Sequence, residues 1–365
     1  MEFEGIDSVA ASFPMISGES PHSYTKNSSH QRILIEASKD LINEAIEDNF
    51  DIETICLSGT KTIGIADLGC SVGQNTLVAV QNIIESIENK HMSNNQNPQS
   101  LEFQVLFNDH SSNDFNTLFT SLTPSRKYYA AGVPGSFYHR LFPKSSLHFV
   151  HCSYALQWMS QVPKQVLDSK SPSWDKNNIH YMNASEELHE AYSAQYKNDM
   201  ESFLNARAEE LVVGGLIVIV VPSVPKKFIP SKTLQAMSYG FNESCLSEMV
   251  KLELISQEEV DSFYIPHYYP TSEELEALIK KNGNFSIERM IVLNRHMGFI
   301  CPSVEWAVGT VRAVTEALFK EKFGDKAIDQ LYERYTVKLT ENFRLFESKF
   351  RELEDLFVIL KNRKD

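Results

Sequence analysis

The sequence predicts an α/β fold in which helices cover both faces of a parallel sheet and a mostly helical cap covers one end. Short β-branched runs alternate with amphipathic helical patterns through the first 222 residues. The central run at 216–221 (LIVIVV) is apolar at every position, which is typical of a strand covered on both faces. Helical patterns then dominate, and we expect two parts: a core over 1–222, 284–294 and 346–365, and a cap over 223–283 and 295–345.

The first βαβ unit can be read directly from the chain. A strand at 62–68 (TIGIADL) ends in a glycine, and the helical pattern over 75–90 places its apolar residues on one face. A polar loop at 91–100 leads to the next strand, 102–107 (EFQVLF). Strand, helix and strand in this order predict a right-handed crossover and a Rossmann-like core.

The remaining helices and strands are predicted from the helical and strand spacings of apolar residues. Residues 1–30 are polar and predict a flexible arm, and a helical pattern begins at Gln31. Gly214 and Gly215 are expected to interrupt the chain before the central strand. Further strands are predicted at 147–151, 287–293 and 356–360, and further helices at 194–211, 234–252, 272–281, 304–319 and 328–350.

The composition is that of a globular protein, with 42% hydrophobic and 22% charged residues. A net charge of −14 argues against nucleic acid as a partner, because a phosphate-binding surface needs basic residues. The longest apolar run, Leu211 to Val221, is too short for a membrane span of about 20 residues. Five scattered cysteines without a CxxC pair, and an acidic segment at 1–7, predict reduced thiols in a cytoplasmic protein.

The turn at 65–76 (IADLGCSVGQNT) carries the first chemical signal. Asp67 closes a strand, and Gly69 and Gly73 allow the backbone to turn close to a ligand. The spacing is not the GxGxxG of a dinucleotide site, which would receive a pyrophosphate. A carboxylate at this place suits a cationic ligand such as S-adenosylmethionine (AdoMet), although an ordinary strand-to-helix turn is the alternative.

Three other segments reach the same edge of the sheet, where ligands of α/β folds bind. Asp109 ends the next strand, so its carboxylate can accept both hydroxyls of a ribose. In the loop at 132–138 (GVPGSFY), two adjacent aromatic side chains can hold a flat ring such as adenine. Tyr154 and Trp158 are four residues apart, so on a helical turn both would face a small organic acid. For each segment, ordinary surface or core residues are the alternative reading.

Taken together, these segments resemble the plant SABATH family of AdoMet-dependent methyltransferases. Members of that family methylate carboxyl groups of small molecules and, in the caffeine branch, ring nitrogens of xanthines. The resemblance runs nearly end to end and implies a class I methyltransferase core. Its motifs are SYTKNS at 23–28, IADLGCSxGxNT, FNDHxxNDFN at 107–116, GVPGSFYxRLFP at 132–143, CSYALQW, RAEELVxGG at 207–215, VDSF at 260–263 and the closing VILK.

The resemblance also implies which residues form the site. The AdoMet pocket would be lined by Tyr24, Cys70, Asn75, Asp109, His110, Ser136 and Phe137. The acceptor pocket would be lined by Gln31, Tyr154, Gln157 and Trp158, with Gln31 and Trp158 orienting the carboxylate. Many members have Leu in place of His110 and Pro in place of Gln74, so the polarity of this pocket differs here.

A homodimer and a structural Mg²⁺ ion are further implications of the resemblance. The ion would be bound by Asp175, Asp261, the backbone carbonyl of Phe263, and Tyr264. The family usually has Asn where this chain has Asp175 and Tyr264. An aspartate is still a suitable oxygen ligand for a hard cation, whereas a phenol is a poor substitute for an amide.

The expected reaction is the formation of a methyl ester from a small acid such as loganate, salicylate or jasmonate, by in-line methyl transfer. A carboxylate is already ionised at neutral pH, so no catalytic base is required. We therefore expect His30, His151 and His267 to be structural or surface residues. Met237, Tyr239, Phe241, Tyr268 and Phe299 are expected either to line the acceptor pocket or to form the core of the cap.

Two other functions remain open at this point. A ring N-methyltransferase of the xanthine type is favoured by Gln157, whose amide could pair with a purine edge. A binding protein that has lost catalysis would retain the acid pocket without affinity for AdoMet. The presence of Gly69, Gly73, Asp109 and Ser136 together argues against that second alternative.

Overall fold

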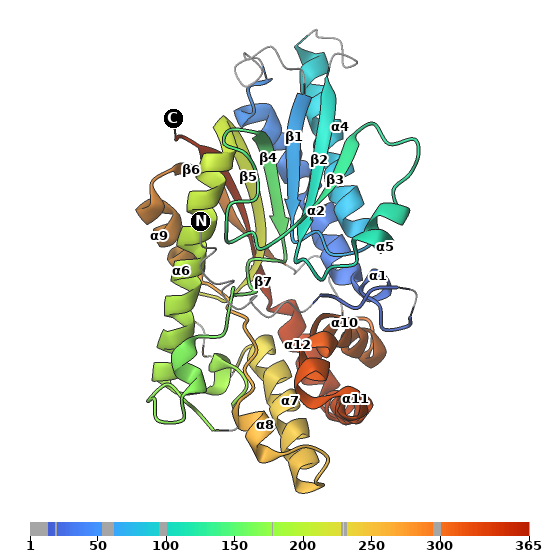
Figure 1. The fold of residues 1–365 in the computed structure, drawn as a ribbon, viewed down its shortest axis with the longest axis vertical. Coiled ribbons are helices and arrows are strands. Elements are labelled where there is room, and N and C mark those ends of the chain that lie inside the picture. Colours follow the sequence, from blue (N-terminus) through green and yellow to red (C-terminus); the bar gives the residue numbers. More distant parts are fainter. Residues whose placement is uncertain are drawn as a thin grey trace, which may run out of the picture.

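The computed structural model contains a seven-stranded sheet with the order β3-β2-β1-β4-β5-β7-β6 (Figure 1). It describes residues 14–18, 20–52, 62–94, 101–176, 178–227, 229, 232–294 and 301–364. The strands are β1 (Thr62–Leu68), β2 (Glu102–Asp109), β3 (Tyr129–Pro134), β4 (Leu147–Ser153), β5 (Leu211–Ser223), β6 (Phe285–Asn294) and β7 (Glu354–Asn362). The predicted parallel pairing holds for β1 to β5, but β7 runs antiparallel to both of its neighbours.

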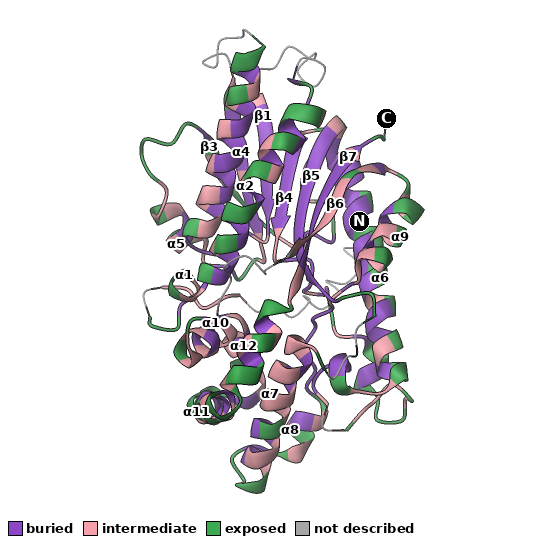
Figure 2. Cartoon of the chain, turned by 180° about the vertical axis from the view of Figure 1, so that it is seen from behind, coloured by how far each residue is buried: buried purple, intermediate pink, exposed green. Residues whose placement is uncertain are grey.

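Helices cover both faces of this sheet, as Figures 1 and 2 show from opposite sides. One face is covered by α2 (Ser29–Asn49) and α4 (Gln74–Ser93), and the other by α6 (Glu186–Glu210) and α9 (Ser272–Asn282). Successive side chains of β5 point to opposite faces of the sheet. Ile217, Ile219 and Val221 pack into one hydrophobic core, and Leu216, Val218 and Val220 into the other. The continuous apolar run is therefore explained by burial on both sides.

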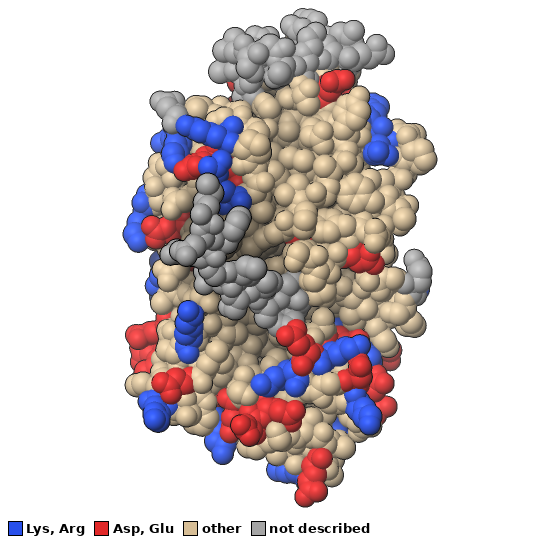
Figure 3. Space-filling view, viewed as in Figure 1, with Lys and Arg blue, Asp and Glu red and all other residues tan. Residues whose placement is uncertain are grey.

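The cap lies beyond the carboxyl ends of the parallel strands (Figure 1). It consists of α7 (Leu234–Lys251), α8 (Gln257–Asp261), α10 (Val304–Phe323), α11 (Asp325–Glu341) and α12 (Phe343–Arg351). Charged side chains of both signs gather on its surface in Figure 3. One such pair, Lys338 with Glu248 (2.6 Å), joins α11 to α7. None of the helices described here is sufficiently long and apolar to cross a membrane.

Several local predictions differ from the structure. The arm expected over 1–30 contains α1 (Tyr24–Asn27) and the start of α2. Strand β3 was not expected, because as an edge strand it is largely exposed and lacks an apolar run. Strand β5 continues through Gly214, whose positive φ of 80° accommodates an irregularity that was expected to be a break. The helix expected over 328–350 is divided at Asn342 into α11 and α12, and α12 packs against α7 within the cap.

Candidate active site

A cavity of about 280 Å³ lies at the carboxyl edge of the sheet, beneath the cap. Residues of the core form one end of it and residues of the cap form the other. From the core, the lining includes Tyr24, His30, Gln31, Gly69, Ser71, Asp109, His110, Phe137, Tyr154, Gln157 and Trp158. From the cap, it includes Gln235, Ser238, Tyr239, Asn242, His267, Tyr269, Thr310 and Thr315.

The turn after β1 is held close to the end of β2. The backbone N–H groups of Gly69 and Cys70 both donate to the carbonyl of Asn108, each at 2.9 Å. Gly69 has a positive φ of 74°, and a Cβ there would lie 2.4 Å from that of Ala155, so a larger residue does not fit. This geometry places the hydroxyl of Ser71 at the cavity, where its buried Oγ has no partner among the residues described.

Asp109 stands beside this turn with both carboxylate oxygens hydrogen-bonded. Oδ2 accepts from the N–H of Ser71 and Oδ1 from the N–H of His110, each at 2.7 Å. Burial raises the pKa of Asp109 above its ordinary value, and the two N–H groups oppose that rise. Each oxygen retains a lone pair, so the carboxylate can still accept hydroxyl groups of a ligand.

Asp67 does not line the cavity, although it closes β1 as predicted. Its carboxylate accepts from the hydroxyl of Thr76 and pairs with Nδ1 of His151 at 2.6 Å. Both side chains of this hydrogen-bonded pair are buried, so the pair joins β1 to β4, and the bond from Thr76 joins β1 to α4. His151 thus has the structural role that the sequence suggested, whereas His30 and His267 line the cavity.

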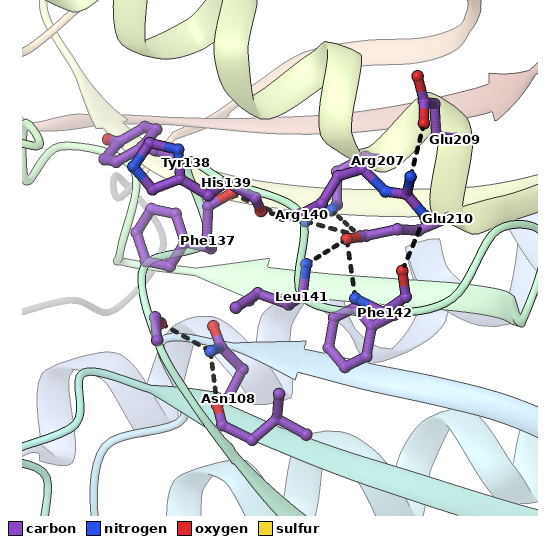
Figure 4. A network of polar contacts seen from close by, with 12 residues as sticks. Asn108, Phe137, Tyr138, His139, Arg140, Leu141, Phe142, Arg207, Glu209 and Glu210 are labelled. Carbon is purple, nitrogen blue, oxygen red and sulfur yellow. Dashed lines mark hydrogen bonds and ion pairs between the residues drawn. The ribbon is translucent and has the colours of Figure 1, made fainter. Parts of the chain in front are cut away.

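Phe137 reaches the cavity from the loop that follows β3, and a buried ion pair holds that loop (Figure 4). Arg207 and Glu210, at the end of α6, have fully buried side chains. Arg207 donates to Glu210 and to the backbone carbonyls of Phe137 (2.7 Å) and His139 (3.0 Å). Glu210 in turn accepts from the N–H groups of Leu141 and Phe142.

Arg207 and Glu210 position the site, although they are not among the site residues expected from the sequence. The available signal was an Arg and a Glu three residues apart on the helix that leads into the fully apolar strand. Charged residues in such a place are buried and must be paired.

On the opposite side of the loop, the amide of Asn108 donates to the carbonyls of Val133 (2.8 Å) and Gly135 (2.9 Å).

Tyr154 and Trp158 both line the cavity, but no helical turn places them there. Tyr154 has a positive φ of 55°, and its hydroxyl donates to Asp355 and lies 3.1 Å from Nε2 of His30. Trp158 forms an isolated antiparallel bridge with His267 instead. The interpretation as a helical turn was therefore wrong, although both side chains face the same cavity.

Gln31 and Gln157 present buried amide oxygens with no partner in the described chain. The amide nitrogen of Gln157 donates to the carbonyl of Tyr154 at 2.8 Å, which leaves its Oε1 for another donor. A buried polar atom without a hydrogen bond destabilises the fold. Such atoms at a cavity therefore indicate that a bound ligand supplies the missing hydrogen bonds. Both glutamines line the cavity.

Three of the predicted cofactor residues are near the cavity without lining it. Asn75 donates to the carbonyl and the hydroxyl of Ser28, each at 3.0 Å, and thereby holds the start of α2. Cys70 is buried, and burial raises the pKa of its thiol. The hydroxyl of Ser136 accepts from the N–H of Tyr138 at 3.3 Å.

The cap residues considered from sequence divide into two groups. Tyr239 lines the cavity, together with neighbours on α7 that sequence analysis did not single out. Met237, Phe241 and Tyr268 pack into the hydrophobic core. Phe299 lies outside the described residues.

The predicted magnesium ligands come from two segments that bond directly to each other. The Tyr264 hydroxyl lies 3.3 Å from both the N–H and the carbonyl of Asp175, and the Asp175 carboxylate accepts from Ser185 N–H at 3.0 Å. The Asp261 carboxylate accepts from Gln257 at 2.7 Å. In the described ranges no three His, Cys, Asp or Glu side chains are grouped to hold a metal. A phenol together with carboxylates that are not grouped does not fit a Mg²⁺ site, which requires several oxygen ligands around one point.

Glu243 of α7 lies near these segments and should make stability depend on pH. It accepts from the N–H of Ile179 at 3.1 Å, and burial raises its pKa from 4.5 to about 7. Because the folded pKa is the higher one, burial of the charge destabilises the fold as pH rises from 4.5 to 7, and fully above that range. We expect Glu243→Gln to be more stable than the parent by on the order of 2 kcal/mol at pH 8, and by much less at pH 5.

Thermal unfolding of both proteins at the two pH values measures this difference. Gln retains the oxygen that accepts from Ile179, so the hydrogen bond itself is preserved. An advantage of Glu243→Gln that is equal at pH 5 and pH 8 would contradict the prediction.

Comparison with known proteins agrees with this geometry. A family profile described as SAM dependent carboxyl methyltransferase matches residues 10–363. The chain belongs to this family. It is therefore an AdoMet-dependent methyltransferase, and the resemblance to the SABATH enzymes is confirmed. The solved structure of a loganic acid methyltransferase with SAH has a TM-score of 0.90 to it at 44% identity, covering 96% of this chain and 99% of the other.

Curated relatives of this methyltransferase differ in their acceptors. Loganic acid O-methyltransferase of Catharanthus roseus is 43% identical over 100% of this chain and 98% of its own length. Farnesoic acid carboxyl-O-methyltransferase of Arabidopsis thaliana is 38% identical, covering 97% and 100%. Paraxanthine methyltransferase 2 of the same plant is 37% identical, covering 95% and 98%.

The residues of this methyltransferase fit AdoMet at the core end of the cavity. Asp109 offers carboxylate oxygens for a diol, and the Ser71 hydroxyl is buried there without a partner in the described ranges. Phe137 supplies an aromatic surface, and Tyr24 closes the pocket from the N-terminal segment. The same cavity is lined by the residues predicted to bind the methyl acceptor, Gln31, Tyr154, Gln157 and Trp158. AdoMet and the methyl acceptor can therefore meet in it.

Proposed function

We propose that this methyltransferase forms the methyl ester of a small hydroxylated acid, of which loganic acid is the first to test. The observation that carries the proposal is the polar lining at the cap end of the cavity. Hydroxyl and amide side chains reach it from α7 and α10, namely Gln235, Ser238, Asn242, Thr310 and Thr315. The hydroxyls of Ser238, Thr310 and Thr315 also bond within the cap, but the buried amide oxygen of Asn242 has no partner in the described chain. An acid with a sugar can donate a hydroxyl to that oxygen, whereas a hydrocarbon chain would leave it unpaired.

The residues of the cavity position the reactants and move no proton. When bound, AdoMet supplies a methyl group on a positively charged sulfur. Gln31 and Trp158 would orient the carboxylate of the acid, and Tyr154 is fixed by Asp355 and His30 so that its ring forms one wall. A carboxylate is ionised at neutral pH, so no base is required. Enclosure by the cap excludes water and preserves this alignment.

Incubation of the purified enzyme with methyl-labelled AdoMet and single acceptors tests the proposal. The panel is loganic acid, salicylate, jasmonate, farnesoic acid and paraxanthine. We expect labelled ester from loganic acid at a higher kcat/KM than from farnesoic acid. Labelled paraxanthine without any ester would favour the xanthine-type alternative that Gln157 suggested, and preference for farnesoic acid would overturn the role given to the polar lining.

We expect removal of divalent metal to leave methyl transfer unchanged. The mechanism above uses no metal, and the predicted ligands around Asp175 and Tyr264 are occupied by bonds between their own segments. Initial rates should therefore agree within about twofold before and after dialysis against EDTA. A loss of rate that Mg²⁺ restores would show that the enzyme binds the ion and would contradict this expectation.

Two expectations from the sequence stay proposals. A cytoplasmic location rests on the scattered cysteines without a CxxC pair. A homodimer rests on the family resemblance alone. Sedimentation of the purified enzyme at micromolar concentration would distinguish a dimer from a monomer of 41.5 kDa.

A further inference from the structure

His267 is placed in the cavity by a rigid set of contacts. Its residue is 5% exposed, and its imidazole packs edge-on against Trp158, with ring centroids 3.8 Å apart and an interplanar angle of 84°. The backbones of the two residues form an antiparallel bridge, flanked by hydrogen bonds from Met159 N–H to the Pro266 carbonyl and from Tyr268 N–H to the Gln157 carbonyl, each at 2.8 Å. The imidazole therefore has little freedom to rotate.

One ring nitrogen of His267 has partners and the other has none. Nδ1 lies 2.8 Å from the hydroxyl of Tyr239, which lies 2.7 Å from the hydroxyl of Tyr269. Nε2 is buried and has no hydrogen-bond partner in the described part of the chain. His267, Tyr239 and Tyr269 all line the cavity. An unpaired buried nitrogen at a ligand cavity points to a ligand atom as its partner.

Counting protons in this group assigns the tautomer. If Tyr239 donates to Nδ1 and Tyr269 donates to Tyr239, both hydroxyl protons have acceptors. In the reverse order, Tyr239 donates to Tyr269 and Tyr269 can donate to Nδ1 at 3.5 Å, so Nδ1 is again the acceptor. If Nδ1 instead carried the proton and donated to Tyr239, the proton of Tyr269 would have no acceptor within the group. Every hydroxyl proton has an acceptor only when Nδ1 accepts a hydrogen bond. Nε2 therefore carries the ring proton. Burial lowers the pKa of His267 to about 3, so the ring remains neutral at physiological pH.

We propose that His267 is a specificity-determining residue whose Nε2–H donates a hydrogen bond to an oxygen of the acceptor acid. This inference rests on the proposed function, because it requires an acid in the cavity beside Trp158. A neutral, fixed donor strengthens binding of an acid that places an oxygen at this point. It weakens binding of an acid that places a hydrocarbon group there, because the buried N–H then has no partner. Tyr239 is a positioning residue in this scheme, since it selects the tautomer that donates.

Steady-state kinetics with loganic acid, combined with calorimetric titration of AdoMet, tests the proposal. His267→Phe retains the ring shape but removes the donor, and we expect KM for the acid to rise about tenfold with kcat and AdoMet affinity unchanged. His267→Gln places an amide N–H near the position of Nε2 and should return KM to within about threefold of the parent. Tyr239→Phe should give an intermediate rise, because either nitrogen can then carry the proton.

His189 provides a matched control on α6. Its ring packs on Tyr181 at 5.1 Å between centroids and does not line the cavity, so His189→Phe should leave KM unchanged. A parental KM in His267→Phe, or a rise that His267→Gln fails to reverse, overturns the proposal. If His267→Phe does not fold, an unchanged KM in Tyr239→Phe overturns it. A parent enzyme that binds AdoMet but methylates no acid instead refutes the proposed function.

Discussion

Replacement of Asp109 by alanine is expected to weaken AdoMet binding by roughly 100-fold or more. The carboxylate is the only acidic group that lines the cavity in the described chain, and it lies at the end of β2 where a ribose diol can reach it. Hydrogen bonds to a charged acceptor each contribute about 1.5–3 kcal/mol, and two would be lost. The variant would also leave the N–H groups of Ser71 and His110 without their acceptor. Calorimetric titration of AdoMet into the purified protein measures the loss.

Asp114 offers a matched control a few residues further along the chain. It caps α5 (Phe115–Thr120) by accepting from Thr117 N–H at 2.9 Å, and it does not line the cavity. Asp114→Ala should lower stability by about 1 kcal/mol and leave AdoMet affinity intact. AdoMet binding by Asp109→Ala with parental affinity would show that the core end of the cavity is not the cofactor site.

Replacement of Arg207 by methionine should destabilise the fold by about 3–5 kcal/mol. The substitution leaves the carboxylate of Glu210 fully buried without its cation, and it removes the donors to the carbonyls of Phe137 and His139. Since those carbonyls belong to the loop that presents Phe137 to the cavity, AdoMet affinity should fall as well. Chemical denaturation monitored by fluorescence reports the first effect, and titration of AdoMet under native conditions reports the second.

The neighbouring pair of Arg140 with Glu209 (3.0 Å) is the control for this prediction. Both of its side chains are largely exposed, so Arg140→Met should cost less than about 1 kcal/mol. Equal destabilisation by Arg207→Met and Arg140→Met would mean that the buried network does not stabilise the loop. Arg207→Lys retains the charge without the planar fork, and it should fall between the parent and Arg207→Met.

The sequence was informative wherever function depends on residues close together in the chain. The turn after β1 and the acid that ends β2 follow from strand, glycine and carboxylate spacing, and the structure joins them through Ser71 and Asp109. It was less informative about partners distant in sequence. Asp67 appeared to be a ligand residue until the structure paired it with Thr76 and His151.

The sequence by itself determined the alternating core, the helical cap and the family, because hydrophobic period and turn residues are local properties. Only the tertiary structure decided which side chains reach the cavity. Trp158 faces it through pairing with His267, and the loop that carries Phe137 is held by Arg207 from a distant helix. The physical reason is that burial and hydrogen-bond partners are set by the packing of segments that are far apart along the chain, which no local pattern encodes.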